Sequence, residues 1–342
     1  MKFLLGLDSF KGCLSSRELG EIGRDYLEER GHQASLVFLS DGGEGLVDSL
    51  MDNLGARLVK DEFTGPLGCP IEASYGLTDD LVLIESAKII GLDLVEKSRR
   101  NPLDTTSYGL GQAIKKGLDQ GRRNFLLGLG GSSTNDLGLG MLSALGYRFY
   151  DDKGQEVGIY GRDLEKISLI DDSRRDKRLK EAKFTVACDV KNPLCGRFGA
   201  SQVYAGQKGA SQKEIEKMDG WFSKFASLIE ETYEIFNRDY PGVGAAGGLG
   251  YGLKTFLGAD LKPGFDLVAG LLDLEEKIGE ADYVITGEGQ LNDQSLMGKG
   301  PVELAKLAKK QGRPCLGFFG SLDLDLEKFN SLGLNACFTI NQ

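Results

Sequence analysis

Short apolar runs that end at acidic or glycine-rich segments recur along this chain. Four of them are LLGLDSFKG at 4–12, FLLGLGGSSTND at 125–136, FTVACDVKNPLCG at 184–196 and DYVITGEGQ at 282–290, and LSDGGEGL at 39–46 has the same form. Runs of this length bounded by turn residues are typical of buried strands. Ligands of open α/β sheets bind beyond the carboxyl ends of the strands, so we expect these segments to converge on a ligand. Their carboxylates and backbone amides suit an anionic, metal-bound ligand.

The two ends of the chain alternate between strand and helix patterns. The apolar runs at 2–7 and 34–40 flank a helix pattern at 15–31 that a serine opens and a glycine closes. Near the other end, a helix pattern at 301–312 lies between further strand patterns. Such alternation predicts a parallel sheet. We therefore expect both termini to form one discontinuous Rossmann-like α/β domain, residues 1–60 and 270–342.

The middle of the chain has a different pattern. Residues 56–87 contain three short runs separated by turn residues, as in an antiparallel meander, and helix patterns resume from 105–121 onward. The length of 342 residues also exceeds the usual size of one domain. We expect a second, mixed α/β domain, residues 61–269, inserted in the first, with the active site in the cleft between the two domains.

Charge and composition exclude several classes of protein. The formal net charge is -10 and no basic stripe occurs, which argues against a nucleic-acid partner. No segment approaches the ~20 apolar residues that a membrane span requires. The six cysteines are scattered, without C-x-x-C spacing, and the start MKFLLGLDSF lacks the long apolar segment of a signal peptide. We expect a soluble cytoplasmic protein, a monomer or homodimer, with no nucleic-acid or membrane partner.

Common hydrolase chemistry is disfavoured by the residues available. His32 is the single histidine, so neither a Ser-His-Asp triad nor a histidine-rich metal site can form. Without a histidine partner, Cys188 and Cys195 are expected to belong to the core. The glycine-rich segment 242–253 lacks the P-loop spacing, and the poor strand before it disfavours a dinucleotide fingerprint and hence a nicotinamide dehydrogenase.

Two glycine-rich segments are candidate anion sites. GLGGSSTND at 128–136 follows a strand and opens a helix, and its three hydroxyls exceed what one helix cap needs. GVGAAGGLGYGL at 242–253 precedes a helical run, so its amides could approach a phosphate; close helix packing is the alternative. The candidate cofactor-binding residues are Gly130, Gly131, Ser132, Ser133, Thr134, Gly244, Gly247, Gly248 and Gly250.

Charged residues that phosphoryl transfer could use follow other strands. Asp189 stands at a strand end, with Lys191 and Asn192 just before a proline that restricts Asn192 to extended geometry. Asp41 follows a second strand, and Glu288 lies at the end of a third. Carboxylates and lysines at these positions indicate chemistry on a charged, metal-bound group.

Eight motifs together carry a resemblance to a known family. In chain order they are DSFKG (8–12), SDGGEG (40–45), TGPLG (64–68), NPLDTTSYGLG (101–111), GLGGSSTND (128–136), ACDVKNPLCG (187–196), GAAGGLGYG (244–252) and TGEGQLNDQS (286–295). This series resembles the glycerate kinase family, which phosphorylates the 2-hydroxyl of glycerate, over nearly the whole chain. The resemblance implies ATP and Mg²⁺ as cofactors, D-glycerate as substrate, 2-phosphoglycerate and ADP as products, and two α/β domains with a cleft between them.

We assign hypothetical roles to the residues within these motifs. Asp189 accepts or orients the proton of the 2-hydroxyl, and Lys11 or Lys191 offsets negative charge on glycerate or the γ-phosphate. Asp41 or Glu288 ligates magnesium. The remaining expected site residues are Asn192 in the catalytic set and Ser9, Asp136 and Asp293 in the substrate-binding set. Which glycine-rich loop holds nucleotide and which holds glycerate stays open.

Two alternatives share most of these features. A kinase of another small hydroxy acid would keep every phosphate-handling loop and differ in the substrate pocket. A non-catalytic relative that binds a nucleotide or an organic acid is favoured by the short C-terminal end and by Gln290, where relatives usually carry arginine. The pair Asn292–Asp293 is a further departure from the family pattern.

Overall fold

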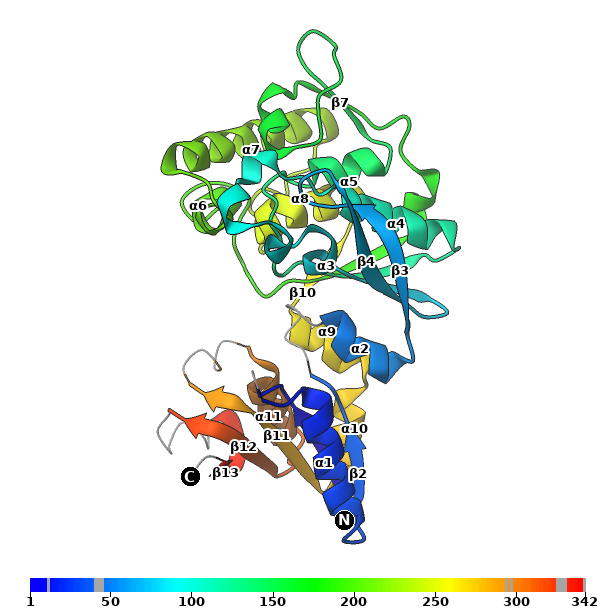
Figure 1. Cartoon of the computed structure of the whole chain (residues 1–342), viewed down its shortest axis with the longest axis vertical. Coiled ribbons are helices and arrows are strands. Elements are labelled where there is room, and N and C mark those ends of the chain that lie inside the picture. The colour runs from blue at the N-terminus through cyan, green and yellow to red at the C-terminus, as the bar shows by residue number, and fades with distance from the viewer. Residues whose placement is uncertain (11–12, 40–45, 293–294, 296–297, 324–330, 341–342) are drawn as a thin grey trace. The chain divides into compact units, whose positions relative to one another are not determined.

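The computed structural model describes residues 1–10, 13–39, 46–292, 295, 298–323 and 331–340 (Figure 1). The chain forms two compact units. The first, called here the terminal unit, consists of Met1–Gly55 and Pro263–Gln342, and the second, the inserted unit, consists of Ala56–Lys262. The α/β fold expected from the sequence, with one parallel-sheet unit built from both termini and a mixed unit inserted between them, is confirmed.

The terminal unit contains a five-stranded parallel sheet. Its strands, in the spatial order β13-β12-β11-β1-β2, are Leu334–Thr339, Cys315–Leu322, Tyr283–Leu291, Lys2–Leu7 and Gln33–Leu36. Strand β1 pairs with β2 on one side and with β11 on the other. The N-terminal and C-terminal parts of the chain therefore share one sheet, in which Leu4 and Leu5 are buried.

The described α-helices of the same unit lie between or beside these strands in the sequence. They are α1 (Ser16–Glu28), α2 (Leu46–Leu54), α9 (Gly264–Leu271), α10 (Leu274–Glu280) and α11 (Gly300–Lys310). Helix α1 begins at a capping box, in which Ser15 and Glu18 each satisfy the other's backbone amide. Helix α11 has Pro301 in its first turn, where a missing N–H costs no hydrogen bond.

The inserted unit contains a six-stranded mixed sheet. Its strands, in the order β10-β9-β6-β5-β4-β3, are Asp260–Lys262, Lys183–Ala187, Asn124–Gly128, Leu81–Glu85, Pro70–Leu77 and Arg57–Thr64. The three runs predicted to form a meander are β3, β4 and β5, which pair antiparallel. Strands β5, β6, β9 and β10 pair in parallel. A separate antiparallel pair joins β7 (Arg148–Tyr150) to β8 (Leu169–Asp171).

The helices of the inserted unit bury apolar faces. The α-helices are α3 (Ser86–Ile90), α4 (Tyr108–Asp119), α5 (Leu139–Ala144), α6 (Ala200–Tyr204), α7 (Gln212–Tyr233) and α8 (Ala245–Leu257). The 3-10 helices are η1 (Leu92–Leu94), η2 (Lys97–Arg99), η3 (Pro102–Asp104), η4 (Gly161–Lys166), η5 (Lys177–Lys180) and η6 (Gly206–Lys208). Helix α7 buries Ile215, Met218, Phe222 and Phe225, a helical spacing that directs one stripe into the core. None of the helices in the described ranges is long and apolar enough to span a bilayer.

Candidate functional site

Two of the predicted segments lie side by side at one edge of the inserted unit's sheet. Strands β6 and β9 are neighbours in parallel register, with Gly128 opposite Ala187. The segments that leave their carboxyl ends are 129–136, called here the anion loop, and 188–199. Because β5 also ends at this edge, next to β6, the adjacent strand order brings polar residues from three connections together.

The anion loop is held through its carbonyl groups. The donor and acceptor pairs are Ser86 Oγ to Gly130 O (3.0 Å), Leu92 N to Gly131 O (2.8 Å), Thr105 Oγ1 to Ser133 O (3.2 Å) and Lys208 Nζ to Thr134 O (2.6 Å). In a trans peptide the C=O of one residue and the N–H of the next point in opposite directions. The amides of Gly131, Ser132, Thr134 and Asn135 therefore point away from these donors.

Several polar groups of the anion loop keep hydrogen-bonding capacity. Over the described ranges, the amides of Gly131, Ser132, Thr134 and Asn135 have no protein acceptor. The buried oxygens Thr134 Oγ1 and Asn135 Oδ1 also lack a partner there. Gly131 is exposed, so one end of the loop is open to solvent. Unpaired backbone donors at the end of a strand fit an anionic ligand.

Asp136 anchors the end of the anion loop in the interior of the inserted unit. Its side chain is fully buried and accepts hydrogen bonds from the Ser107 amide at 2.8 Å and the Ser107 hydroxyl at 2.7 Å. The amides of Gly138 and Gly140 donate to it at 3.2 Å each. Burial raises the pKa of this carboxyl, and the four donors act against that rise. These contacts join the loop to α4 and α5, and the substrate-binding role expected for Asp136 stays a prediction.

Lys208 is a residue that the sequence did not single out. It lies at the end of η6, is only 3% exposed, and reaches the loop with its ammonium group. Besides Thr134 O, Nζ donates to Ser132 Oγ at 3.1 Å. Burial lowers the pKa of Lys208 to about 7, and the charge of Asp136 acts in the opposite direction. Lys208 is one of many lysines in a polar, helix-rich stretch of sequence. Nothing in the neighbouring residues indicates that its side chain is buried.

The segment after β9 presents Asp189 and Lys191 at the surface, where both side chains are exposed. The Asn192 side chain forms hydrogen bonds within the protein. Its Nδ2 donates to Phe198 O at 2.8 Å, and its Oδ1 accepts from the Tyr204 hydroxyl at 2.7 Å. Asn192 therefore shapes the segment that carries Asp189, and its direct part in catalysis stays a prediction.

The second glycine-rich segment packs against both of these loops. The N–H of Gly244 donates to Asn192 O at 2.9 Å, and the carbonyl of Gly247 accepts from the Leu137 amide at 3.1 Å. A Cβ on Gly247 would lie 2.1 Å from Thr134 O, and its φ of +68° also favours glycine. Close backbone packing accounts for these glycines. Phosphate binding by Gly244, Gly247, Gly248 and Gly250 stays a prediction.

In the terminal unit, the ends of β1 and β11 are also adjacent. The amide of Asp8 donates to Gly287 O at 2.8 Å, and the Ser9 amide donates to Asp8 Oδ1 at 2.6 Å. Glu288 is 3% exposed, and its Oε2 accepts from Lys299 Nζ at 2.7 Å. Its Oε1 is buried and finds no partner within the described ranges. A buried carboxylate oxygen without a donor is costly, so this atom fits a cation or a ligand donor.

Three predicted residues, Lys11, Asp41 and Asp293, lie outside the described residues. Within the described part of the chain, no group of three or more histidine, cysteine, aspartate or glutamate side chains could hold a metal ion. Magnesium bound with a nucleotide commonly takes one or two protein carboxylates plus phosphates and waters. Glu288 alone is therefore compatible with such a site.

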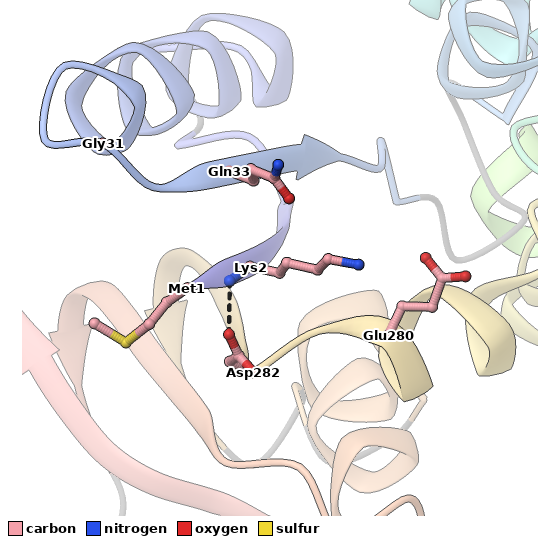
Figure 2. Close-up of a pocket in the computed structure, with 6 residues that line it drawn as sticks. All are labelled: Met1, Lys2, Gly31, Gln33, Glu280 and Asp282. Carbon is pink, nitrogen blue, oxygen red and sulfur yellow. Dashed lines mark hydrogen bonds between the residues drawn. The ribbon is translucent and has the colours of Figure 1, made fainter.

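A depression of about 560 Å³ lies at the opposite edge of the terminal unit's sheet (Figure 2). It is lined by Met1, Lys2, Gly31, Gln33, Glu280 and Asp282. The Lys2 amide donates to the Asp282 carboxylate at 2.8 Å across it. Because these residues lie at the amino ends of parallel strands, away from the carboxyl-end loops, we assign the depression no part in the site.

Cysteine chemistry has no support in this arrangement. Cys188 and Cys195 are half-buried and pack against the core of the inserted unit. Burial raises the pKa of the Cys188 thiol to about 11 and also raises that of Cys195, so both are poor nucleophiles near neutral pH.

Comparison with known proteins places these features in a family context. The family model described as "Glycerate kinase family" matches residues 3–342. The glycerate kinase of Bacillus subtilis (strain 168) is 42% identical, over 99% of this chain and 90% of the relative. The glycerate 2-kinase of Escherichia coli (strain K12) is 41% identical over the same shares, 99% and 90%.

A solved structure shows the same architecture. The crystal structure assigned to glycerate kinase 2 of Salmonella typhimurium LT2 is 40% identical and has a TM-score of 0.92. The match covers 100% of this chain and 90% of that one.

Proposed function

Because the chain belongs to the glycerate kinase family, we propose that it transfers the γ-phosphate of ATP to the 2-hydroxyl of D-glycerate, giving 2-phosphoglycerate and ADP. The resemblance inferred from the eight motifs is confirmed by the family match. The chain is thus an enzyme, a phosphotransferase that acts on an alcohol group. The nucleotide and the position phosphorylated are our proposals.

The observation that carries the proposal is the direction of the amides in the anion loop. Phosphoryl transfer between two anionic substrates depends mainly on positioning and charge neutralisation. A loop whose carbonyls face the protein, and whose amides of Gly131, Ser132, Thr134 and Asn135 lack protein acceptors within the described ranges, supports binding of a carboxylate or phosphate there.

Asp189 supplies the base in the proposed reaction. It follows β9, whose carboxyl end adjoins the anion loop, and its side chain is exposed, so a substrate hydroxyl can reach it. The carboxylate orients the 2-hydroxyl and accepts its proton as the oxygen attacks the γ-phosphorus. Lys191, two residues further on, offsets negative charge on the substrates.

Magnesium would be held by Glu288, whose buried Oε1 lacks a partner within the described ranges. When bound, the ion neutralises charge on the phosphate oxygens. Lys299 holds the other carboxylate oxygen of Glu288 and so fixes the orientation of the side chain. We propose a cytoplasmic setting for the reaction, in keeping with six cysteines that are all free thiols.

The test is direct identification of the product. The purified protein is incubated with ATP, Mg²⁺ and D-glycerate and followed by phosphorus NMR, with controls lacking glycerate or Mg²⁺ and one containing L-glycerate. Appearance of 2-phosphoglycerate and ADP only in the complete mixture is expected. Formation of 3-phosphoglycerate would overturn the proposed regiochemistry. Turnover with other hydroxy acids but not with D-glycerate would establish the alternative kinase, and ligand binding without turnover would establish a non-catalytic relative.

A further inference from the structure

The backbone around Lys208 directs this lysine into the protein. The Lys208 amide donates to Ala205 O at 3.1 Å, which closes the short helix η6. The next residue, Gly209, has φ of +100°, and a Cβ there would lie 2.0 Å from Arg100 O. Only glycine suits that turn. The path of the chain therefore fixes the buried position of Lys208.

Burial of a lysine here needs a compensating contact. A fully buried ammonium group is costly, and an apolar side chain of the same length would pack at lower cost. Lys208 Nζ instead bonds Thr134 O at 2.6 Å and Ser132 Oγ at 3.1 Å. These two acceptors flank Ser133, whose amide and hydroxyl both donate to Ile90 O at 2.9 Å. The ammonium group thus holds the anion loop at both sides of its central residue.

The position of the charge also matters to a bound anion. The ammonium group accepts electron density from the carbonyl of Thr134 and so polarises the peptide whose N–H belongs to Asn135, making that N–H a stronger donor. Asp136, the last residue of the same loop, is fully buried. The buried carboxylate of Asp136 would repel an anion at the adjacent loop, and the lysine charge offsets that repulsion.

From these contacts we propose that Lys208 is a positioning residue of the enzyme: its buried ammonium group orders the anion loop, so that the loop amides bind the carboxylate or phosphate oxygens of a substrate. The inference rests on the proposed function for the identity of the substrates. Glycerate and the nucleotide both carry an oxyanion that the loop amides could bind, so either can be the ligand of the loop.

The main test replaces Lys208 and measures each substrate separately. In Lys208→Met, which keeps the length of the side chain and removes its charge and donors, we expect KM and Kd to rise at least about 10-fold for one substrate. A change of that size corresponds to loss of one charged contact. The KM of the other substrate is expected to change less than about 2-fold. Calorimetric titrations with D-glycerate and with ADP–Mg²⁺ decide which substrate the loop binds.

Controls separate positioning from folding. Lys213→Met, at an exposed position of α7, should leave both KM values unchanged. If Lys208→Met does not fold, Lys208→Gln is the second variant, because it removes the charge but keeps an N–H donor on a somewhat shorter side chain. Unchanged KM and Kd for both substrates in a folded Lys208 variant would overturn the proposal, even if the variant is less stable.

A measurement on the unaltered protein gives an independent check. An oxyanion bound over the loop favours the charged form of Lys208, so binding at pH 8 should take up protons. The apparent binding enthalpy should then differ between HEPES and Tris buffers, and Lys208→Gln should abolish the difference. Absence of proton uptake on binding either ligand argues against the proposal. Because binding needs no turnover, these results remain interpretable if the protein fails to phosphorylate glycerate.

Discussion

The carboxylate of Asp136 accepts two hydrogen bonds from Ser107, one from the backbone amide at 2.8 Å and one from the hydroxyl at 2.7 Å. The two residues are 29 positions apart in the sequence, and both are fully buried. The pair joins the start of α4 to the end of the anion loop. A buried carboxylate with these partners is expected to contribute to stability as well as to the geometry of the loop.

Replacing Asp136 by asparagine should destabilise the inserted unit by about 3 kcal/mol, because an NH₂ group would face buried donors. Trp221, the single tryptophan, lies in this unit and packs against its core, so its fluorescence in urea follows the relevant transition. Asp152→Asn, at an exposed position, is the matched control. A midpoint equal to that of the control would contradict the structural role.

Stability should depend on pH through Lys208. Burial lowers the pKa of Lys208 from 10.5 to about 7 in the folded protein. Between these values the unfolded chain binds more protons than the folded one, so the free energy of unfolding rises with pH, by at most about 1.4 kcal/mol per pH unit for one proton. Lys208→Met should lack this contribution. Urea titrations followed by Trp221 fluorescence at pH 7, 8 and 9 measure the free energy of unfolding of both proteins. An equal dependence on pH in the two proteins would count against the contribution of Lys208.

Replacing Asp189 by asparagine should lower kcat by at least about 100-fold if Asp189 acts as the base, since general bases contribute about 10²–10⁴. The thermal midpoint of the variant, measured alongside, separates a loss of catalysis from a loss of folding. Asp239→Asn, also exposed and in the same unit, should retain full activity. Near-normal turnover in Asp189→Asn would end the assignment.

Two glycine substitutions should have opposite effects on stability. Gly247→Ala would place a Cβ 2.1 Å from Thr134 O at a φ of +68°, so we expect a loss of more than about 2 kcal/mol. Gly220→Ala lies within α7, where a Cβ would meet nothing within 4 Å, so a gain of about 0.5–1 kcal/mol is expected. Urea unfolding followed by far-UV circular dichroism measures the stability of both variants. An unchanged stability of Gly247→Ala would show that packing does not require this glycine.

Replacing Glu288 by glutamine should raise the Mg²⁺ concentration for half-maximal activity by about 10-fold or more, because the carboxylate charge that binds the ion is lost. Activity measured against Mg²⁺ at fixed ATP gives this value. The exposed Glu276→Gln is the control in the same unit. An unchanged Mg²⁺ dependence would remove Glu288 from the metal site.

Much of the fold was predictable from local patterns. The apolar run that became β6 and the amphipathic spacing of α7 each depend on residues close in sequence, so periodicity identifies them. The strand-end positions of Asp189 and of the anion loop follow from the same patterns, since loops begin where apolar runs stop. The motif series was also sufficient to indicate the family.

Contacts between distant segments were not predictable in this way. The glycines around Gly247 are consistent in sequence with a phosphate cradle or with close packing, and only the approach of Thr134 O reveals the packing. The sequence also did not reveal that the Asn192 side chain bonds to Phe198 and Tyr204, within its own segment and α6.

The sequence by itself determined the α/β alternation, the strand ends where polar residues gather and the family to which the chain belongs. Each of these features depends on residues that are close together in the sequence. The tertiary structure decided which of these residues meet. Lys208 lies 74 positions from Thr134 and 76 from Ser132, and no local pattern distinguishes it from an exposed lysine. Its burial, its depressed pKa and its hold on the anion loop arise only when folding brings η6 against the loop and removes water from both.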